Sequence, residues 1–148
     1  MFNFVRAYFL ESMKNASWNH CEIIDFATCE DSRGVLTFTD NTRLPFPIRR
    51  VFWIYAIGKG QTRGGHAHRT CAEILIAVSG SFSVQVFCGT ASHKFELTNP
   101  REGLLIPPMA WCELTDFTPD AVCLCLASRD YEPDGYINDF ETYLKTCD

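Results

Sequence analysis

The stretch Gly60-Gln61-Thr62-Arg63-Gly64-Gly65-His66-Ala67-His68 carries two histidines two positions apart, behind a glycine-rich loop. Glu73 and Gly80 follow shortly afterwards. Side chains at positions i and i+2 of a strand point to the same face, so we expect His66 and His68 to project into one space. Imidazoles in a pocket can bind a metal ion or transfer protons near neutral pH. The stretch therefore indicates a site on a strand, either a metal centre or an acid–base pair.

The composition limits the classes of protein to which the chain can belong. Its 148 residues suit one domain, and 47% hydrophobic against 21% charged residues supports an ordinary core and excludes general disorder. The net charge of −5 without a long basic run argues against nucleic-acid binding, and no apolar stretch is long enough to cross a membrane. A small phosphorylated ligand could still be attracted by a local group of arginines, namely Arg43, Arg49, Arg50, Arg63 and Arg69.

The eight cysteines raise the question of disulfide bonds. Several of them stand within apolar strand patterns, namely Cys71, Cys88, Cys123 and Cys125. Buried cysteines of this kind behave as small hydrophobic residues, so we expect free thiols and a cytoplasmic protein.

Short apolar segments separated by turn residues recur along the chain. We expect strands at Cys21–Ala27, Val35–Thr39, Arg50–Ile57, Glu73–Val78, Phe82–Phe87, His93–Leu97, Gly103–Ile106, Trp111–Phe117 and Ala121–Ala127. The apolar spacing within Tyr136–Lys145 predicts one short C-terminal helix. Many short strands with regular turns indicate an all-β barrel or sandwich, which places a ligand pocket between its sheets.

Two resemblances to known families rest on these residues. The spacing G-x5-H-x-H-x4-E-x6-G resembles the first motif of the cupin superfamily. A narrower set resembles the sugar-nucleotide 3,4-ketoisomerases, and its members are Asp31-Ser32-Arg33-Gly34, Arg50-Val51-Phe52-Trp53-Ile54-Tyr55, Arg63-Gly64-Gly65-His66-Ala67-His68, Gly103-Leu104-Leu105-Ile106-Pro107-Pro108 and Leu126-Ala127-Ser128.

The resemblance implies a fold, a reaction and a partner. The fold is all-β, a cupin double-stranded β-helix (jelly-roll barrel) with a short C-terminal helix, in which residues 1–18 form an N-terminal extension and residues 19–148 a single cupin domain. The substrate is a TDP-4-keto-6-deoxyhexose, whose keto group moves from C4 to C3 during the biosynthesis of unusual deoxy sugars. The resemblance further implies a homodimer that needs no metal and no cofactor.

The resemblance also implies roles for particular residues. His68 is the base that enolises the sugar, and His66 orients it or hydrogen-bonds the sugar oxygens. An imidazole suits this task because its pKa lies near the working pH. Glu73 holds a histidine in place near the substrate.

Four further residues are expected to bind the substrate. Arg33 and Arg63 are candidates for the diphosphate or the developing oxyanion, because arginine binds phosphate in a bidentate way. Trp53 and Tyr55 share one face of their strand, and one of them could hydrogen-bond the sugar or stack near thymine. Ordinary core packing of these aromatic residues is the competing interpretation.

Other interpretations stay open. A metal-dependent cupin enzyme could use His66, His68, Glu73 and Cys112, although Cys112 stands where cupins usually carry a third histidine. A sugar-nucleotide epimerase would also begin with enolisation, and a non-catalytic sugar-binding cupin would need no base. Tyr131 and Tyr136 are assigned to packing or dimer contacts.

Overall fold

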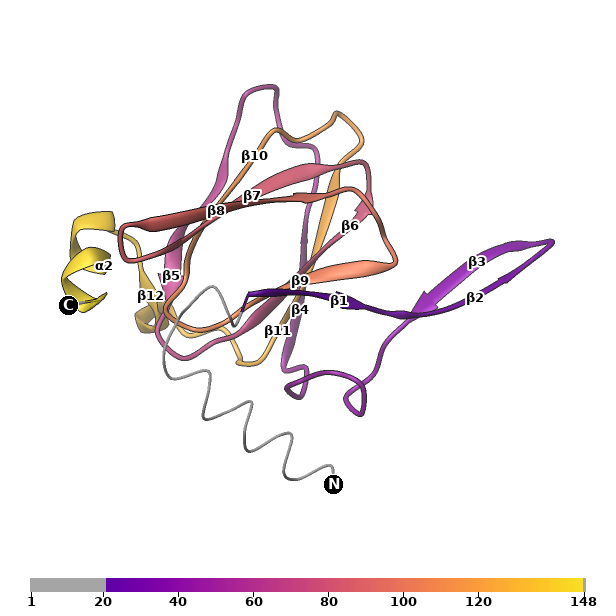
Figure 1. Ribbon diagram of the computed structural model, residues 1–148, viewed down its shortest axis with the longest axis horizontal. Helices are drawn as coiled ribbons and strands as arrows, with labels where there is room; N and C mark the ends of the chain where they lie inside the picture. The colour runs from indigo at the N-terminus through magenta and orange to yellow at the C-terminus, as the bar shows by residue number, and fades with distance from the viewer. Residues whose placement is uncertain (1–20, 148) are drawn as a thin grey trace.

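The computed structural model describes residues 21–147, which form two five-stranded antiparallel sheets, a two-stranded hairpin and a short helix (Figure 1). The expected N-terminal extension, residues 1–18, lies outside the described residues. The elements are β1 (Glu22–Asp25), β2 (Ala27–Asp31), β3 (Gly34–Phe38), β4 (Arg50–Ile54), β5 (Arg63–His68), β6 (Glu73–Ser79), β7 (Phe82–Cys88), β8 (Ala91–Leu97), β9 (Glu102–Ile106), β10 (Trp111–Thr115), β11 (Val122–Ala127), a 3₁₀ turn (Pro133–Gly135), β12 (Tyr136–Ile137) and α2 (Phe140–Cys147). This confirms the all-β jelly-roll barrel with a short C-terminal helix.

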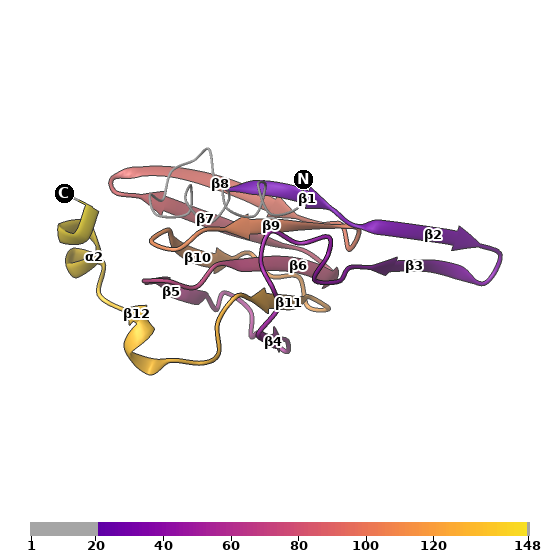
Figure 2. The ribbon, with the colours of Figure 1, turned by 90° about the horizontal axis from the view of Figure 1, so that it is seen from below.

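The order of the strands shows which strands form the edges of the two sheets, where the barrel is open. One sheet has the order β1-β9-β6-β11-β4 and the other β12-β5-β10-β7-β8 (Figure 2). The strand β4 is therefore the last of its sheet, while β12, at the edge of the facing sheet, spans only two residues. Beyond this short strand, β5 has no strand partner on that side among the described residues. The histidines lie beside this edge.

The central strand β6 shows how the sequence builds two layers of core. Leu75 and Ala77 face the space between the sheets, while Ile74 and Ile76 face the outer side. There they pack under the loop before β4, which contributes the buried Phe46. Burying each of the leucine, isoleucine and phenylalanine side chains contributes about 1.5–3 kcal/mol. The strand β6 is therefore buried on both faces, as befits the central strand of its sheet.

The expected strand Cys21–Ala27 is wrong in its extent, because Phe26 divides it into β1 and β2. The last pair between β1 and β9 is Asp25 with Glu102, and just beyond it the backbone N–H of Phe26 donates to the carbonyl of Arg101. Beyond this point, β3 is the one strand with which β2 pairs within residues 21–147. The resulting hairpin projects away from the two sheets in both views, with the turn of residues 31–34 at its tip (Figures 1 and 2).

The helix expected over Tyr136–Lys145 is also wrong at its N-terminal end. The helix α2 begins at Phe140, because the Asp139 carboxylate accepts a hydrogen bond of 2.7 Å from the backbone N–H of Thr142, as an N-terminal cap does. Tyr136 and Ile137 instead extend the facing sheet by pairing with β5. This pairing brings Tyr136 to the site described next.

Candidate active site

The two histidines share one face of β5, as their spacing predicts. Their ring centroids lie 4.9 Å apart, with the rings nearly perpendicular. Gly64 and Gly65 precede them with φ angles of 76° and 77°, in the left-handed region that favours glycine. A Cβ atom at Gly64 would lie 2.6 Å from the carbonyl oxygen of Cys112 on β10. The glycines therefore allow the close approach of β5 to β10 that positions the histidines.

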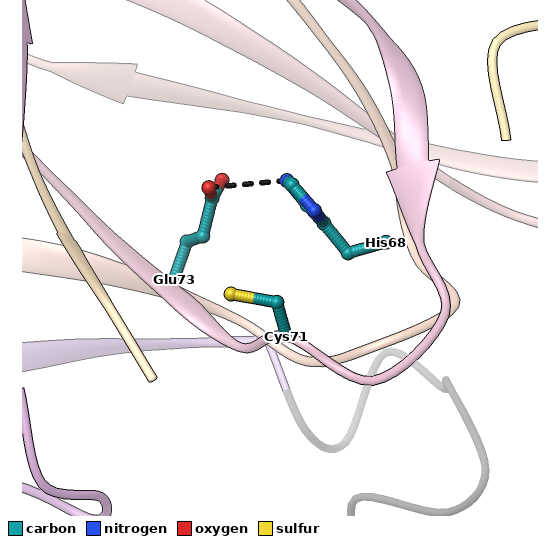
Figure 3. A group of neighbouring side chains, drawn as sticks. All are labelled: His68, Cys71 and Glu73. Carbon is teal, nitrogen blue, oxygen red and sulfur yellow. Dashed lines mark ion pairs between the residues drawn. The ribbon is translucent and has the colours of Figure 1, made fainter. Parts of the chain in front are cut away.

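Glu73, the first residue of β6, faces His68 across the end of the barrel (Figure 3). The Nε2 atom of His68 and the Oε1 atom of Glu73 lie 3.0 Å apart, and both side chains are buried. The pair is close enough for electrostatic attraction, but the geometry does not make a well-directed hydrogen bond. Neither atom has a hydrogen-bond partner among the described residues. A further polar group could therefore bind to these two atoms.

Arg50 brings a positive charge to this pair from β4. Its Nη2 atom lies 3.7 Å from the Oε1 atom of Glu73, and its Nη1 donates a hydrogen bond of 3.3 Å to the hydroxyl of Tyr136. Its guanidinium also lies over the rings of Phe52 and Tyr131. These contacts connect the edge of one sheet with the edge of the other.

Tyr136 lies directly against both imidazoles. Its ring centroid is 4.5 Å from that of His68 and 5.0 Å from that of His66. The pairing of β12 with β5 sets Tyr136 opposite His68. The assignment of this residue to packing or dimer contacts therefore missed its place beside the imidazoles.

Arg50 was also missed as a site residue, although a local signal existed. It stands two positions before Phe52 and four before Ile54, which pack on the core, so period two places it on the inward face of β4. Tyr136 has no such local signal, because its position depends on pairing with a strand far away in the sequence.

Burial and neighbouring charges set the ionisation of the site. Burial lowers the pKa of His66 from its ordinary value of 6.5, and the charge of His68 lowers it further. Burial alone would raise the pKa of Glu73, but the contact with His68 and the charges of His66 and Arg50 outweigh it, so this pKa is lowered. At neutral pH the site therefore holds a neutral His66 and an ionised Glu73.

The structure does not bring the remaining expected residues to the histidines. Arg33 is exposed at the tip of the hairpin and pairs with Asp31, while Arg63 is exposed at the start of β5. Trp53 is 60% exposed on the outward face of β4, opposite to Arg50, and Tyr55, which follows the end of this strand, is 63% exposed. Neither aromatic side chain is buried in the barrel.

A pocket of about 420 Å³ opens beside the site. Its lining includes Arg49 and Arg129, the acidic residues Asp130 and Glu132, and Thr70 and Ser128, and Arg49 is ion-paired with Asp130 at 2.9 Å. A narrower cleft shares Thr70 and Arg129 with this pocket and reaches His68. The pocket is thus large enough for a small ligand, carries two arginines and communicates with the imidazole.

The donor atoms that could hold a metal ion differ from the expected set. Within residues 21–147, one group of three such donors lies within 4.8 Å of one another, and it consists of His68, Cys71 and Glu73 (Figure 3). Neither His66 nor Cys112 belongs to this group. Cys112 is instead buried in the core between the sheets.

The expectation of free thiols is confirmed. None of the eight cysteines forms a disulfide bond. Cys71, Cys123 and Cys125 are buried, whereas Cys88 is half-buried. No helix within the described part of the chain is long and apolar enough to span a membrane.

Comparisons with known proteins agree with this architecture. The family model FdtA, described as WxcM-like, C-terminal, matches residues 19–148. The chain is 34% identical over 125 residues to a TDP-4-oxo-6-deoxy-alpha-D-glucose-3,4-oxoisomerase from Aneurinibacillus thermoaerophilus, covering 84% of this chain and 90% of that protein.

Two solved structures show the same similarity in three dimensions. A mutant of the 3,4-ketoisomerase QdtA from Thermoanaerobacterium thermosaccharolyticum, in complex with TDP-4-keto-6-deoxyglucose, has a TM-score of 0.86 and 32% identity over 88% of this chain and 96% of that chain. The TDP-fucose-3,4-ketoisomerase WlaRA from Campylobacter jejuni has a TM-score of 0.82 and 29% identity over 86% of this chain and 96% of that chain. The chain therefore belongs to the FdtA family, described as WxcM-like, C-terminal, and its resemblance to the sugar-nucleotide 3,4-ketoisomerases is confirmed.

Proposed function

We propose that the protein is a 3,4-ketoisomerase that moves the keto group of a TDP-4-keto-6-deoxyhexose from C4 to C3. Relatives that carry this activity in their names cover most of the chain. The observation that carries the proposal for this chain is the buried pair of His68 and Glu73, which lies beside the hydroxyl of Tyr136 at the open edge of the barrel. Enolisation needs a base, a group that orients the base and a donor for the oxyanion.

His68 acts as the base in this proposal. The hydrogen on C3 lies next to the C4 ketone, so its transfer to the imidazole leaves an enediolate with the negative charge on oxygen. A proton then passes between the two sugar oxygens, and His68 returns its proton to C4, which leaves the ketone at C3. The carboxylate of Glu73 orients the imidazole and stabilises the imidazolium that forms between the two steps.

Tyr136 and Arg50 stabilise the enediolate. The phenol can donate a hydrogen bond to the sugar oxygen that becomes negative, and the guanidinium that donates to this phenol favours negative charge there. The neutral His66 is free to hydrogen-bond a sugar oxygen. The site therefore supplies donors where charge develops.

The substrate diphosphate is assigned to the adjacent pocket. Arg49 and Arg129 line it, and phosphate is a preferred partner of the planar guanidinium group. The cleft between this pocket and His68 has a volume of about 10 Å³, so a sugar attached to the diphosphate reaches the base when the side chains that line the cleft move aside. Arg63 stays a candidate for the nucleotide portion, as do Trp53 and Tyr55.

A homodimer belongs to the proposal. The projecting hairpin exposes apolar side chains, with Val35 49%, Leu36 62% and Phe38 39% exposed. Contact with a second copy would bury these side chains and would carry Arg33 at the hairpin tip onto that copy. This arrangement is the one in which Arg33 can serve a substrate site.

A cytoplasmic location is also part of the proposal. Eight cysteines without a single disulfide bond suit a reducing compartment, since an oxidising one favours bridges between cysteines.

The test uses the purified full-length chain with TDP-4-keto-6-deoxyglucose, followed by NMR in D₂O. We expect exchange of the C3 hydrogen and appearance of a 3-keto sugar. His68→Asn should abolish both, while binding of TDP, measured by calorimetry, persists. Binding of the substrate without exchange would instead identify a sugar-binding cupin. Exchange with inverted stereochemistry and an unmoved ketone would identify an epimerase.

A further inference from the structure

We propose that His68, Cys71 and Glu73 form a binding site for a transition-metal ion of the zinc type, and that an ion bound there stops the isomerase reaction. The inhibitory part rests on the proposed function, because it requires His68 to act as the base. Cys71 stands at one of the unspecified positions of the motif that resembles the cupins, so this donor set differs from the one expected on His66, His68, Glu73 and Cys112.

The three donors suit zinc in both type and position. Imidazole nitrogen, thiolate sulfur and carboxylate oxygen are the ligands that Zn²⁺ takes in proteins. Their atoms lie within 4.8 Å of one another in the structure, and the nearest pair, from His68 and Glu73, is 3.0 Å apart. Ligands around a tetrahedral zinc ion are roughly 3.3–3.6 Å apart, so side-chain movements of about 1 Å suffice.

The buried polar atoms of the site lack partners, which is the second observation. The Nε2 atom of His68 and the Oε1 atom of Glu73 have no hydrogen-bond partner among the described residues, although these side chains are only 6% and 4% exposed. An unpartnered polar group in such a position is costly, and a bound cation would satisfy both. His68 and Cys71 also line the narrow cleft, whose volume of about 10 Å³ is enough for one water molecule or one ion of similar size.

The charges at the site are compatible with a divalent ion despite Arg50. Binding removes the proton of the Cys71 thiol to solvent and forms a metal–sulfur bond, while Glu73 is already ionised. A zinc ion with one thiolate and one carboxylate forms a complex of zero net charge, so the guanidinium, 3.7 Å from the Glu73 oxygen, does not face a cation.

Coordination explains the inhibition. A neutral imidazole has one nitrogen with a free lone pair, and a metal ion bound to His68 takes that lone pair while the ring proton stays on the other nitrogen, so the imidazole cannot accept the C3 proton. Cys71 has no step of its own in the proposed reaction. The thiol therefore adds affinity for the ion without contributing to turnover. A mutation of Cys71 should weaken metal binding and leave turnover in the absence of metal unchanged.

The test is a titration of the reduced, chelator-treated full-length protein with Co²⁺, followed by competition with Zn²⁺. Wild type should bind one ion per chain and show a thiolate-to-cobalt charge-transfer band in the near ultraviolet. Cys71→Ser and Cys71→Ala should lose the band and bind Zn²⁺ at least about 100-fold more weakly. Two control variants should keep the band. Cys29→Ser changes an exposed thiol, and Cys112→Ala changes the residue that stands where cupins usually carry a third histidine. Circular dichroism verifies that each variant is folded.

Activity is measured in parallel. Zn²⁺ should suppress wild-type turnover, a chelator should restore it, and Cys71→Ser should keep its turnover at the same free Zn²⁺. A wild type without the band, or a band that survives in folded Cys71→Ser, overturns the metal site. Turnover unchanged by bound zinc overturns the inhibition. If the chain shows no isomerase activity at all, the proposed function fails, while the cobalt band still reports on the site.

Discussion

The imidazole of His68 lies 3.0 Å from the carboxylate of Glu73, and the two residues belong to neighbouring strands of the chain that lie in opposite sheets. Both side chains are buried, so water competes little with their attraction. The relationship holds the imidazole at the open edge of the barrel. It is the feature from which the proposed chemistry follows.

Replacing Glu73 by glutamine should lower kcat roughly 100-fold or more, because the isosteric amide keeps the shape but cannot stabilise the imidazolium. Steady-state kinetics with TDP-4-keto-6-deoxyglucose measure the change. KM and TDP binding should change little, since the carboxylate acts on the base rather than on the nucleotide. Glu141→Gln, in the first turn of α2, is the matched control and should keep full activity. An active Glu73→Gln would remove Glu73 from the mechanism.

Tyr136→Phe should also lower kcat, by roughly 100-fold, because the ring that packs against the imidazoles stays while the donor for the enediolate is lost. The comparison is Tyr131→Phe, which removes a hydroxyl from a neighbouring ring that is 65% exposed. Tyr131→Phe should retain turnover. Equal activities for the two variants would mean that the hydroxyl of Tyr136 takes no part in the reaction, in keeping with a role in packing or dimer contacts.

Gly64→Ala should destabilise the fold by about 2 kcal/mol or more, through a positive φ and a Cβ atom that meets the carbonyl of Cys112 at 2.6 Å. Gly60→Ala is the control, because Gly60 has a φ of +74° but open space around its Cβ position, so about 1 kcal/mol is expected. Urea unfolding of both variants gives the two free energies of unfolding. A Gly64→Ala protein as stable as Gly60→Ala would show that the approach of β5 to β10 is not tight.

The stability of the protein should fall as the pH is lowered below 6.5, in part because of His66. Its pKa is lower in the folded chain than the ordinary value of 6.5, so between these two values the unfolded chain binds more protons. The free energy of unfolding therefore decreases with falling pH in this window, and His66 contributes no pH dependence above it. Glu73 adds its own loss only below its ordinary value of 4.5.

The variant His66→Gln isolates this effect. Urea unfolding of wild type and variant from about pH 7.5 to about pH 5.5 should give a smaller decrease of stability for the variant. Parallel curves for the two proteins would mean that the pKa of His66 is the same in the folded and unfolded chains.

Much of the local structure follows from periodicity in the chain. The alternation of side chains along a strand sets His66 and His68 on one face of β5. The same alternation separates Phe52 and Ile54 of β4, which pack on the core, from the exposed Trp53. The apolar surroundings of Cys123 and Cys125 indicated buried thiols, which the structure contains. These features depend on neighbours within one strand, so a reader of the sequence has what is needed to predict them.

The sequence by itself determined the all-β barrel, the placement of two imidazoles together and the family, because strand alternation and short motifs are local properties. Only the tertiary structure decided that Tyr136 and Arg50 join the imidazoles, that Cys71 lies near them, and that Arg33 projects away on a hairpin. These positions depend on which strand edges pair and where a chain leaves its sheet. Such choices are made by contacts between distant segments, since many pairings satisfy the same local pattern of apolar residues.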